Sequence, residues 1–595
     1  PVLRIRPKVV NLFYKATDNL IRITFVIPVS RPCNTKTTPL HPNQKRQEIM
    51  KKSFITLLLC LCCSFVIKAQ TNSPHVERPR LVIGIVVDQM RWDYLYRFYP
   101  RFGEGGFRRL MNEGFSCDNT HLNYIPTVTA IGHSSIYTGS VPSIHGIAGN
   151  NFYKNDTLVY CTDDPTVTGV GSNSPAGKMS PRNLLVTTIG DELKLATNFR
   201  SRVIGVALKD RASILPAGHT PDAAYWFDDE TGRFITSTYY RESLPQWLND
   251  FNQRDLARQY LLQDWDTLYP IETYTASTAD STAYELPLAD TPILPVPTSH
   301  LFEQKGYSVI RTTPYGNSLT LELAKAVLKG EQLGQGPETD MLTVSLSSTD
   351  YVGHQFGTYA IETEDTYLRL DRDLADFFRT LDETIGKNNY LLFLTADHAA
   401  AHNFRLMQDC GIPAGGWYAG TVKDSLNAVL DKQFGSGHPL VKDILNYQVF
   451  FDHAYIRQAN IDLRAAKACA IDFLKSYPQF AYVADMEDLS NATLPADVRE
   501  RAINGYNRLR SGDIQLIMQP GWYNIDRPDK TGGTDHGVWN PYDAHIPLFF
   551  MGWHIESGNT FHPVHMTDIA ATVCALLRIQ MPNGCIGTPV ETVVE

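Results

Sequence analysis

Charged side chains are scarce in this sequence, and it contains neither a periodic repeat nor a low-complexity tract. Charged residues make up 20% of the 595 residues, whereas hydrophobic residues make up 43%. This balance is typical of a globular protein, and the missing repeat argues against a repeat architecture. The length suits one large α/β domain with insertions, or several smaller domains.

Closely spaced cysteines are also missing from the main part of the chain. Six cysteines follow residue 69, and no two of them form a Cys-x-x-Cys pair, which argues against a cysteine-based metal site. Their wide spacing excludes a small disulfide-stapled scaffold, although an oxidising compartment would permit one or two disulfides. The six are Cys117, Cys161, Cys410, Cys469, Cys574 and Cys585.

The first 69 residues differ from the rest of the chain. Residues 1–49 begin with Pro1, are basic and show no pattern, so we interpret them as translated upstream sequence. From Met50, two lysines and an apolar run over residues 54–67 lead to Ala69. This order is typical of a cleavable secretory signal peptide over residues 50–69, so we expect export to the periplasm or out of the cell.

Two alternatives to a cleaved signal peptide stay open. The apolar run is too short to span a bilayer comfortably, but an uncleaved N-terminal anchor is the main alternative. A lipoprotein fits less well, because Leu59 and Cys62, rather than small residues, precede the candidate cysteines Cys60 and Cys63. We therefore expect no stable membrane insertion after signal cleavage, and a catalytic domain over residues 70–595.

Positive charge is scarce in that domain. Residues 1–69 hold 12 of the 54 Lys and Arg and 2 of the 63 Asp and Glu, which leaves 42 basic and 61 acidic residues and a net charge of −19. Such a surface repels nucleic acid and anionic membranes, so we expect neither as a partner. An anionic substrate would need a locally positive site, such as a metal cluster.

Three apolar runs rich in β-branched residues each lead to an aspartate. Residues 81–87 end at Asp88, residues 341–346 lead on to Asp350, and residues 390–396 end at Asp397. Such runs are typical of strands buried on both faces of a parallel sheet. A single aspartate there is more often a helix cap. Since ligands bind beyond the carboxyl ends of such strands, we expect the three aspartates to meet in one crevice.

Helical patterns complete the fold prediction. Residues 362–385 carry apolar residues at three- and four-residue spacing, and a helical stretch over 568–579 follows a strand over 546–551. Strands alternating with helices indicate an α/β fold with a doubly wound, mostly parallel central sheet flanked by helices. The segments at about 225–320 and 405–525 lack strand-end aspartates, and we interpret them as cap-like insertions.

Three histidines accompany the aspartates. His354 lies four residues after Asp350, His398 follows Asp397, and His536 lies in a glycine-flanked loop. With Asp88, the set of three carboxylates and three imidazoles suits zinc, and its size fits two ions with three ligands each. Two such ions would hold the attacking and leaving oxygens of a phosphoryl transfer.

The remaining histidines are weaker candidates for metal ligands. Any one histidine is more often a surface or capping residue, and this is our expectation for His121, His133, His145 and His219. Roles for His402 and His545 near the predicted ligands stay open.

Thr129 is the candidate nucleophile. Residues 126–139 predict a loop that enters a helix at about Thr129 and ends at Gly139. A hydroxyl at a helix N-terminus lies beside free backbone N–H groups, which favour an oxyanion or a bound phosphate, although a threonine there is more often an N-cap. Threonine is too weak an acid to attack unaided, so a metal ion would have to bind its alkoxide.

The order of these motifs closely resembles that of one enzyme group, the phosphate-irrepressible, threonine-nucleophile alkaline phosphatases of the alkaline phosphatase superfamily. The likeness covers essentially residues 78–595, and it implies zinc-dependent hydrolysis of phosphate monoesters through a phosphothreonine intermediate. The motifs are, in order, residues 86–94, residues 126–133, Lys209-Asp210-Arg211, Asp350-x3-His354, Asp397-His398 and His536.

The resemblance also implies a role for each site residue. The zinc that binds Thr129 would have the ligands Asp88, Asp397 and His398. The zinc that carries the hydrolytic water would have the ligands Asp350, His354 and His536. The residues implied to bind phosphoryl oxygens are Asn150, Lys209 and Arg211.

Lys209 and Arg211 favour a monoester on chemical grounds as well. They follow the apolar run 203–208 and lie two residues apart, so in an extended segment both side chains would point to one side. A monoester presents a doubly charged group with three oxygens, which two cations offset best. Taken alone, a Lys-x-Arg pair is more often solvated.

Two positions complicate the pattern. Many superfamily members have glycine after the Asp-His pair, where this chain has Ala399. If that position needed a positive φ, alanine would cost about 1 kcal/mol. Asp535 precedes His536 and could replace it as a ligand, but we keep the histidine.

Other functions compete with this interpretation. The closest alternative is a phosphodiesterase or nucleotide pyrophosphatase of the same superfamily, which needs a pocket for a second phosphate substituent. A sulfatase is disfavoured because no Cys/Ser-x-Pro-x-Arg motif marks the nucleophile, and a phosphoethanolamine transferase would need several membrane spans. A non-catalytic zinc protein would lack a ligand or the nucleophile. We expect small phosphorylated substrates and favour a monomer.

Overall fold

The computed structural model describes residues 77–594 throughout, together with an antiparallel strand pair, β1 (Pro7–Ala16) and β2 (Asn19–Pro28), and single positions between 43 and 54. The chain divides into two units, Pro1–Glu77 and Arg78–Glu595. The predicted signal peptide, residues 50–69, lies outside the described residues except for three helical positions up to residue 54. No helix in the described part of the chain has the length and apolar character that a membrane span requires.

A ten-stranded sheet forms the centre of the second unit. Its five inner strands are parallel, and antiparallel strands flank them on both sides, so the predicted mostly parallel α/β fold is confirmed. The parallel strands, in spatial order, are β13 (Tyr390–Thr395), β3 (Leu81–Val87), β12 (Asp340–Leu346), β9 (Val203–Ala207) and β10 (Ala223–Asp228). The flanking strands include β4 (Phe115–Cys117) and β21 (Leu548–Gly552) on one side and β11 (Arg233–Ser237) on the other.

The inner strands end almost level with one another. Val87 of β3 is paired with Leu346 of β12, and Val86 is paired with Thr395 of β13. Every residue of β3, β9, β12 and β13 is buried, as expected for strands covered on both faces. Because parallel strands that end together deliver their following residues to one edge, this edge is where a site can be assembled.

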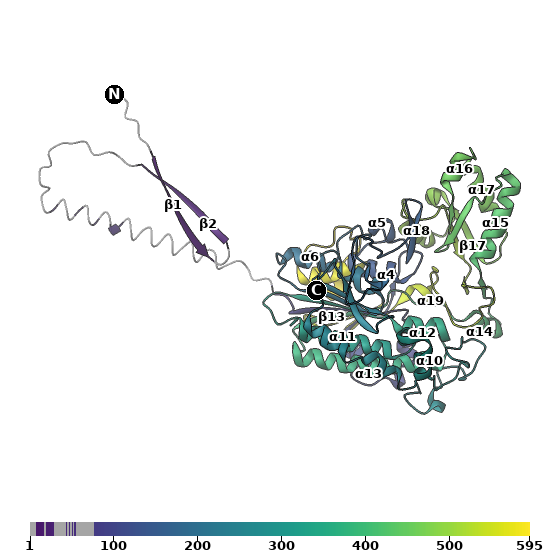
Figure 1. Cartoon of the computed structure of the whole chain (residues 1–595), viewed down its shortest axis with the longest axis horizontal. Helices are drawn as coiled ribbons and strands as arrows, with labels where there is room; N and C mark the ends of the chain where they lie inside the picture. The colour runs from purple at the N-terminus through teal and green to yellow at the C-terminus, as the bar shows by residue number, and fades with distance from the viewer. Residues whose placement is uncertain are drawn as a thin grey trace, which may run out of the picture. The chain divides into compact units, whose positions relative to one another are not determined.

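Helices cover both faces of the sheet. Figure 1 shows α11 and α13 on one side of β13 and α4, α5 and α6 on the other. The apolar stripe predicted within residues 362–385 is buried in α13, from Tyr367 to Leu381. The covering helices are α11 (Tyr315–Gly330) and α13 (Ile361–Thr384) on the first face, and α4 (Thr129–Thr138), α5 (Pro142–His145) and α6 (Ile189–Ala196) on the second.

A second sheet lies within the segment predicted as an insertion at 405–525. Its four antiparallel strands, with three helices, enclose a hydrophobic core of their own, which includes Leu426, Val449 and Leu516. Figure 1 shows α15, α16, α17 and β17 grouped together at a distance from β13. The elements are α15 (Ala419–Phe434), β15 (Val441–Leu445), β16 (Gln448–Phe451), α16 (His453–Gln458), α17 (Leu463–Leu474), β17 (Phe480–Asp485) and β18 (Ile514–Met518).

The other predicted insertion, at about 225–320, needs a correction. Its first residues form most of β10 and all of β11, which extend the main sheet beside β9. β10 ends at Asp228, but β11 runs antiparallel to it and no aspartate follows, so no sequence pattern marked β11 as a strand of the main sheet. The rest of the segment forms short helices and loops, including α8 (Gln246–Gln253), α9 (Leu256–Leu261) and α10 (Thr298–Lys305).

Candidate metal centre and active site

The residues predicted to converge do lie at one edge of the sheet. Asp88 follows β3 directly, Lys209 follows β9 after one residue, and Asp397 follows β13 after one residue. Asp350 lies in the first turn of α12 (Ser348–Phe356), the helix after β12. All four side chains are buried, as the crevice prediction requires.

Asp88, Asp397 and His398 form one compact group. Nε2 of His398 lies 3.7 Å from Oδ1 of Asp88 and 3.5 Å from Oδ2 of Asp397. Those three atoms are buried and have no hydrogen-bond partner among the described residues. An isolated buried donor or acceptor is costly, so three of them pointing at one another need a shared partner.

Asp350, His354 and His536 form the second group. Asp350 and His354 lie one helical turn apart on α12, which places them on the same helix face. Nε2 of His354 lies 3.1 Å from Oδ1 of Asp350, and Nε2 of His536 lies 3.6 Å from the same oxygen. The rings of His398 and His536 are stacked, with centroids 3.6 Å apart, so the two groups adjoin.

Each of the three histidines is oriented by a backbone carbonyl. Nδ1 of His354 lies 3.0 Å from Thr534 O, Nδ1 of His398 lies 3.0 Å from Ala399 O, and Nδ1 of His536 lies 2.7 Å from Thr127 O. An Nδ1–H donated to a carbonyl fixes the tautomer and directs the lone pair of Nε2 into the group. This is the arrangement that metal-ligating histidines usually show.

The charges of the buried side chains also indicate that the two groups bind cations. Three buried carboxylates lie around one lysine, whose Nζ is 2.8 Å from Asp88 and 2.6 Å from Asp350. Burial, together with the neighbouring Asp397, raises the pKa of Asp88 well above its ordinary value despite Lys209. Burial also lowers the pKa of His398 and, with help from the other two histidines, that of His536. The neighbouring Asp350 instead raises the pKa of His354 to about 9, against the effect of burial. Two neutral imidazoles and three clustered carboxylates fit divalent cations.

The donor set therefore fits two metal ions. Each group offers three ligand atoms within 4.8 Å of one another, from carboxylates and imidazoles. Oxygen and nitrogen donors of this kind suit zinc and its neighbours among the transition metals. The two positions that complicate the sequence pattern are compatible with these metal groups. Ala399 has no positive φ, and His536 rather than Asp535 completes the second group.

Thr129 is the first residue of α4, and its helix ends at Gly139 as the sequence predicts. The N-cap residue is Val128, so Thr129 is not the cap, and its Oγ1 makes no hydrogen bond within the described residues. The helix packs tightly on the first metal group. A Cβ on Gly132 would lie 2.3 Å from the carbonyl oxygen of Asp397.

Asn150 is fixed against the same helix. Its Oδ1 accepts a hydrogen bond of 3.0 Å from the backbone N–H of Ala130. That contact orients the amide and leaves Nδ2 without a hydrogen-bond partner in the described part of the chain. Asn150 therefore presents a free donor beside the N-terminus of α4, where a phosphoryl oxygen is expected to bind.

Lys209 and Arg211 lie close together, but not on an extended segment as expected. The helix α7 (Asp210–Ala217) begins directly after Lys209, so Arg211 belongs to its first turn. The guanidinium of Arg211 donates to the hydroxyl of Tyr160 at 2.9 Å, while its Nε is buried without a partner among the described residues. Arg211 thus retains an unused donor.

Two residues at the metal groups escaped the sequence analysis. Nδ1 of His133, which we classed as structural, lies 3.2 Å from Oδ2 of Asp397. Nε2 of Gln89 donates to Oδ1 of Asp350 at 2.7 Å, and the backbone of Gln89 has a φ of 65°. The spacing of four between Thr129 and His133 was the available signal, because it places both on one face of α4.

The other histidines lie outside both metal groups. His402 contacts Arg91 and Thr358, while His545 is stacked on Trp92 and His121. All six cysteines of residues 77–594 are free, so none of the permitted disulfides forms between described residues.

A cavity of about 300 Å³ opens on the second metal group, at His354 and His536. One end is lined by Val128, Asn150, His354, Asp535 and His536. The other end is lined by residues of the second sheet and its neighbours: Trp417, Ala419, Ile444, Leu445, Asn446, Tyr447 and Asn524. A substrate bound there would contact both parts of the unit.

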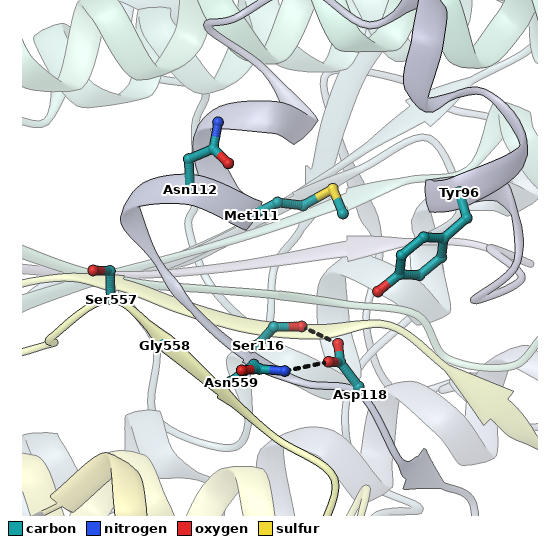
Figure 2. Close-up of a pocket in the computed structure, with 8 residues that line it drawn as sticks. All are labelled: Tyr96, Met111, Asn112, Ser116, Asp118, Ser557, Gly558 and Asn559. Atoms are coloured by element: carbon teal, nitrogen blue, oxygen red, sulfur yellow. Dashed lines mark hydrogen bonds between the residues drawn. The ribbon is translucent and has the colours of Figure 1, made fainter.

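A larger cavity, of about 380 Å³, lies near β4 and contains none of the predicted site residues. Figure 2 shows its single carboxylate, Asp118, bonded to Ser116 at 2.5 Å and to Asn559 at 3.0 Å. Both oxygens are satisfied, so this cavity lacks the unpaired groups that mark the metal centre.

Comparisons with known proteins agree with this geometry. Residues 82–542 match the family model described as type I phosphodiesterase / nucleotide pyrophosphatase. The alkaline phosphatase PafA of Elizabethkingia meningoseptica is 50% identical over 90% of this chain and 98% of that protein. The alkaline phosphatase PhoV of Synechococcus elongatus is 53% identical over 86% of this chain and 92% of its own.

A Myroides odoratus protein named calcium-transporting ATPase is similar to the same degree, at 51% identity over 91% of this chain and 99% of its own. Among solved structures, wild-type alkaline phosphatase PafA superposes with a TM-score of 0.85 at 51% identity, covering 87% of this chain and all of that one.

Proposed function

Because this chain belongs to the type I phosphodiesterase / nucleotide pyrophosphatase family, within the alkaline phosphatase superfamily, we propose that it hydrolyses phosphate monoesters with two zinc ions and Thr129 as nucleophile. Relatives at 50% and 53% identity over most of the chain are alkaline phosphatases, so the chain is a hydrolase of that type. The observation that carries the proposal is the set of buried, unpaired ligand atoms of Asp88, Asp397 and His398 beside α4.

The proposed residue roles agree with a solved variant of alkaline phosphatase PafA. In that variant a threonine and an asparagine 21 residues apart, and a lysine and an arginine two residues apart, are substituted. Thr129 and Asn150 have the first separation, and Lys209 and Arg211 have the second. This correspondence supports Thr129 as nucleophile and the other three as ligands of the phosphoryl group.

The reaction proceeds in two balanced steps. Oγ of Thr129 attacks phosphorus, the bond from phosphorus to the ester oxygen breaks, and the alcohol leaves with a proton. Water then attacks the phosphothreonine, which releases inorganic phosphate and restores the threonine hydroxyl. Bound metal ions would supply Lewis-acid stabilisation of charge and lower the pKa of a hydroxyl or water.

The chain's own residues position the phosphoryl group. Nδ2 of Asn150 donates to one phosphoryl oxygen, and its orientation is set by Ala130 N. Lys209 and Arg211 offset the negative charge that remains on the other oxygens. Gln89 holds Asp350 and Asp397 in place, because it donates to both carboxylates. Catalysis is then mostly preorganisation and charge stabilisation.

The rival function, cleavage of phosphodiesters, is favoured only by the name of the matching family. Lys209 and Arg211, as ligands of the phosphoryl group, favour a dianionic monoester, because a diester carries one charge and needs space for a second substituent. Rates on nitrophenyl phosphate and bis-nitrophenyl phosphate distinguish the two. We expect the monoester to be hydrolysed at least a hundredfold faster, and a faster diester would refute the proposal.

The nucleophile and the metals are tested on the same protein. Thr129→Ala should abolish nearly all turnover while elemental analysis still finds two zinc ions per chain, and Thr129→Ser should keep part of the activity. Chelation should remove activity, and added zinc should restore it. Two bound ions of another metal would overturn the zinc assignment but leave the reaction intact.

The proposed enzyme acts outside the cytoplasm. Support comes from the signal-peptide pattern of residues 50–69, followed by a net negative domain without a membrane span in its described helices. N-terminal sequencing of exported protein should give a chain that begins near residue 70, whereas a chain that retains residues 50–69 would point to the anchor.

A further inference from the structure

The outer wall of the active-site cavity is the turn between β15 and β16. Leu445 is paired with Gln448, so Asn446 and Tyr447 alone make the turn. Their φ angles are 54° and 59°, the left-handed conformation of a type I′ hairpin. Such turns strongly favour Asn-Gly, and a bulky residue with positive φ is uncommon. The tyrosine is retained here at a cost in backbone strain, which suggests that its side chain is needed.

Both side chains of this turn are bonded to the catalytic loops. The hydroxyl of Tyr447 donates to His536 O at 3.2 Å, and it accepts the backbone N–H of Asn524 at 3.0 Å. Nδ2 of Asn446 donates to Asn151 O at 2.9 Å, next to the proposed phosphate ligand. The second sheet is therefore fixed to the loops of a metal ligand and of Asn150.

The wall itself is apolar and uncharged. Ile444 and Leu445 precede the turn, and Trp417 and Ala419 lie beside it, with Trp417 only 4% exposed. No lysine or arginine is among the residues that line this cavity in the described part of the chain, and Asp535 adds negative charge near the metal end. An anionic group in this space would be desolvated without a cationic side chain to offset its charge.

We propose that this wall binds the alcohol part of the substrate and selects neutral esters with an aromatic or aliphatic group over esters of anionic alcohols. This inference rests on the proposed function, because it takes the phosphoryl group to lie at the Asn150 and His536 end. A cavity of about 300 Å³ then holds one ring or a short aliphatic chain beside the phosphoryl group. Nucleoside triphosphates, whose leaving group is itself a polyanion, fit poorly.

Two substrates whose alcohols have similar acidity test binding at the wall separately from the rate of the chemical step. We compare kcat/KM for 2-phenylethyl phosphate and ethyl phosphate, and include phosphoglycolate as the anionic ester. Burial of the phenyl ring should make the first about tenfold better than ethyl phosphate, while phosphoglycolate should be worse than ethyl phosphate.

Variants at the wall test whether the wall causes the preference for the phenylethyl ester. Leu445 is partly exposed at the wall, so Leu445→Ser should fold, and it should reduce the phenylethyl-to-ethyl ratio to about two or three. The matched control is Ile503→Ser, because Ile503 is 44% exposed on α18 (Ala496–Gly505) and does not line the cavity. It should keep the wild-type ratio. Leu445→Ala serves if the serine variant unfolds.

The outcomes separate the two proposals. A wild-type ratio near one, or an equal ratio in wild type and both Leu445 variants, overturns the alcohol site while phosphatase activity stands. A preference for phosphoglycolate overturns it as well. Failure of the zinc-loaded wild type to release phosphate from any of the three esters refutes the proposed function itself.

Discussion

At the scale of single residues, the site depends on which atoms of a side chain already make a hydrogen bond and which remain free for the substrate. Asn150 gives its oxygen to Ala130 N and keeps its amino group for the substrate. Asn150→Asp should therefore leave thermal unfolding unchanged, because the acceptor is retained, but lower kcat/KM by about a hundredfold or more. The loss should exceed that of Asn150→Ala, since a carboxylate repels the phosphoryl group. Equal losses in the two variants would contradict a donor role.

Another residue-scale prediction concerns His145, which lies five residues before Asn150. Its Nδ1 accepts from Ile147 N at 3.1 Å, and Nε2 lies 3.2 Å from Oγ of Ser135. Burial, helped by the charge of Arg510, lowers the pKa of His145 to about 3. An unfolded chain with a pKa of about 6.5 binds this proton first, so stability is lost as pH falls from about 6.5 toward 3.

We expect His145 to lower the free energy of unfolding by about 2 kcal/mol when the pH falls from 7 to 5. Urea titrations at both pH values should show that the free energy of unfolding falls less between pH 7 and pH 5 in His145→Gln than in wild type. The comparison cancels contributions from His121 and His402, whose pKa values burial also lowers. Parallel losses in the two proteins would refute the assignment.

The meeting of the six side chains in two groups could be predicted from the sequence, because each aspartate directly follows or lies near a recognisable buried strand. It did not predict His133 or Gln89, whose contacts with Asp397 and Asp350 depend on how α4 and β3 pack. It also missed the start of α7 at Asp210, since an apolar strand followed by Lys-x-Arg has no helix-capping signal.

At the scale of elements, the contact of α4 with the end of β13 sets the distance between nucleophile and metal group. Gly132 permits this contact, because a Cβ there would lie 2.3 Å from Asp397 O and 2.6 Å from its Cβ. Glycine to alanine within a helix ordinarily stabilises by about 1 kcal/mol. Here we expect Gly132→Ala to destabilise the protein and to lower both activity and metal content.

Thermal unfolding, elemental analysis and kcat/KM on one preparation check this prediction. A variant with normal metal content and a higher unfolding temperature would show that α4 can move away without consequence. The ordinary preference of helices for alanine is thus opposed by a steric conflict at one position.

The main-sheet strands were predictable as elements because their apolar runs are continuous. The turn Asn446–Tyr447 was not, since it reaches the active site from a segment whose only sequence sign was the lack of strand-end aspartates. β10 and β11 were also assigned to an insertion, although β10 ends at Asp228. Residues that contact a site from a separate sheet leave no local pattern.

At the scale of the whole molecule, the metal ions and the fold stabilise each other. Chelation should lower the unfolding temperature of the wild type by several degrees, because ligands bound at a thousandfold excess over Kd contribute about 4 kcal/mol each. Asp88→Asn should reverse the order of stability of variant and wild type, because burial and the neighbouring Asp397 raise the pKa of Asp88 well above its ordinary value. It should be less stable than wild type with metal and at least as stable without it, since one of three clustered carboxylates is neutralised.

Scanning calorimetry of both proteins, with zinc and with chelator, gives the four unfolding temperatures. At position 88, asparagine can still accept from Nζ of Lys209 through its oxygen, so lost hydrogen bonding does not explain the difference. A variant that is less stable in both conditions would contradict the electrostatic account.

The six metal ligands are spread from Asp88 to His536 along the chain. Synthesis therefore delivers the final ligand only when about nine tenths of the protein has been made. A fragment truncated between residues 398 and 536 retains one complete triad and an incomplete second one. Such a fragment could capture a single cation but would lack the second proposed site, so binding of both proposed ions requires the chain to extend past His536.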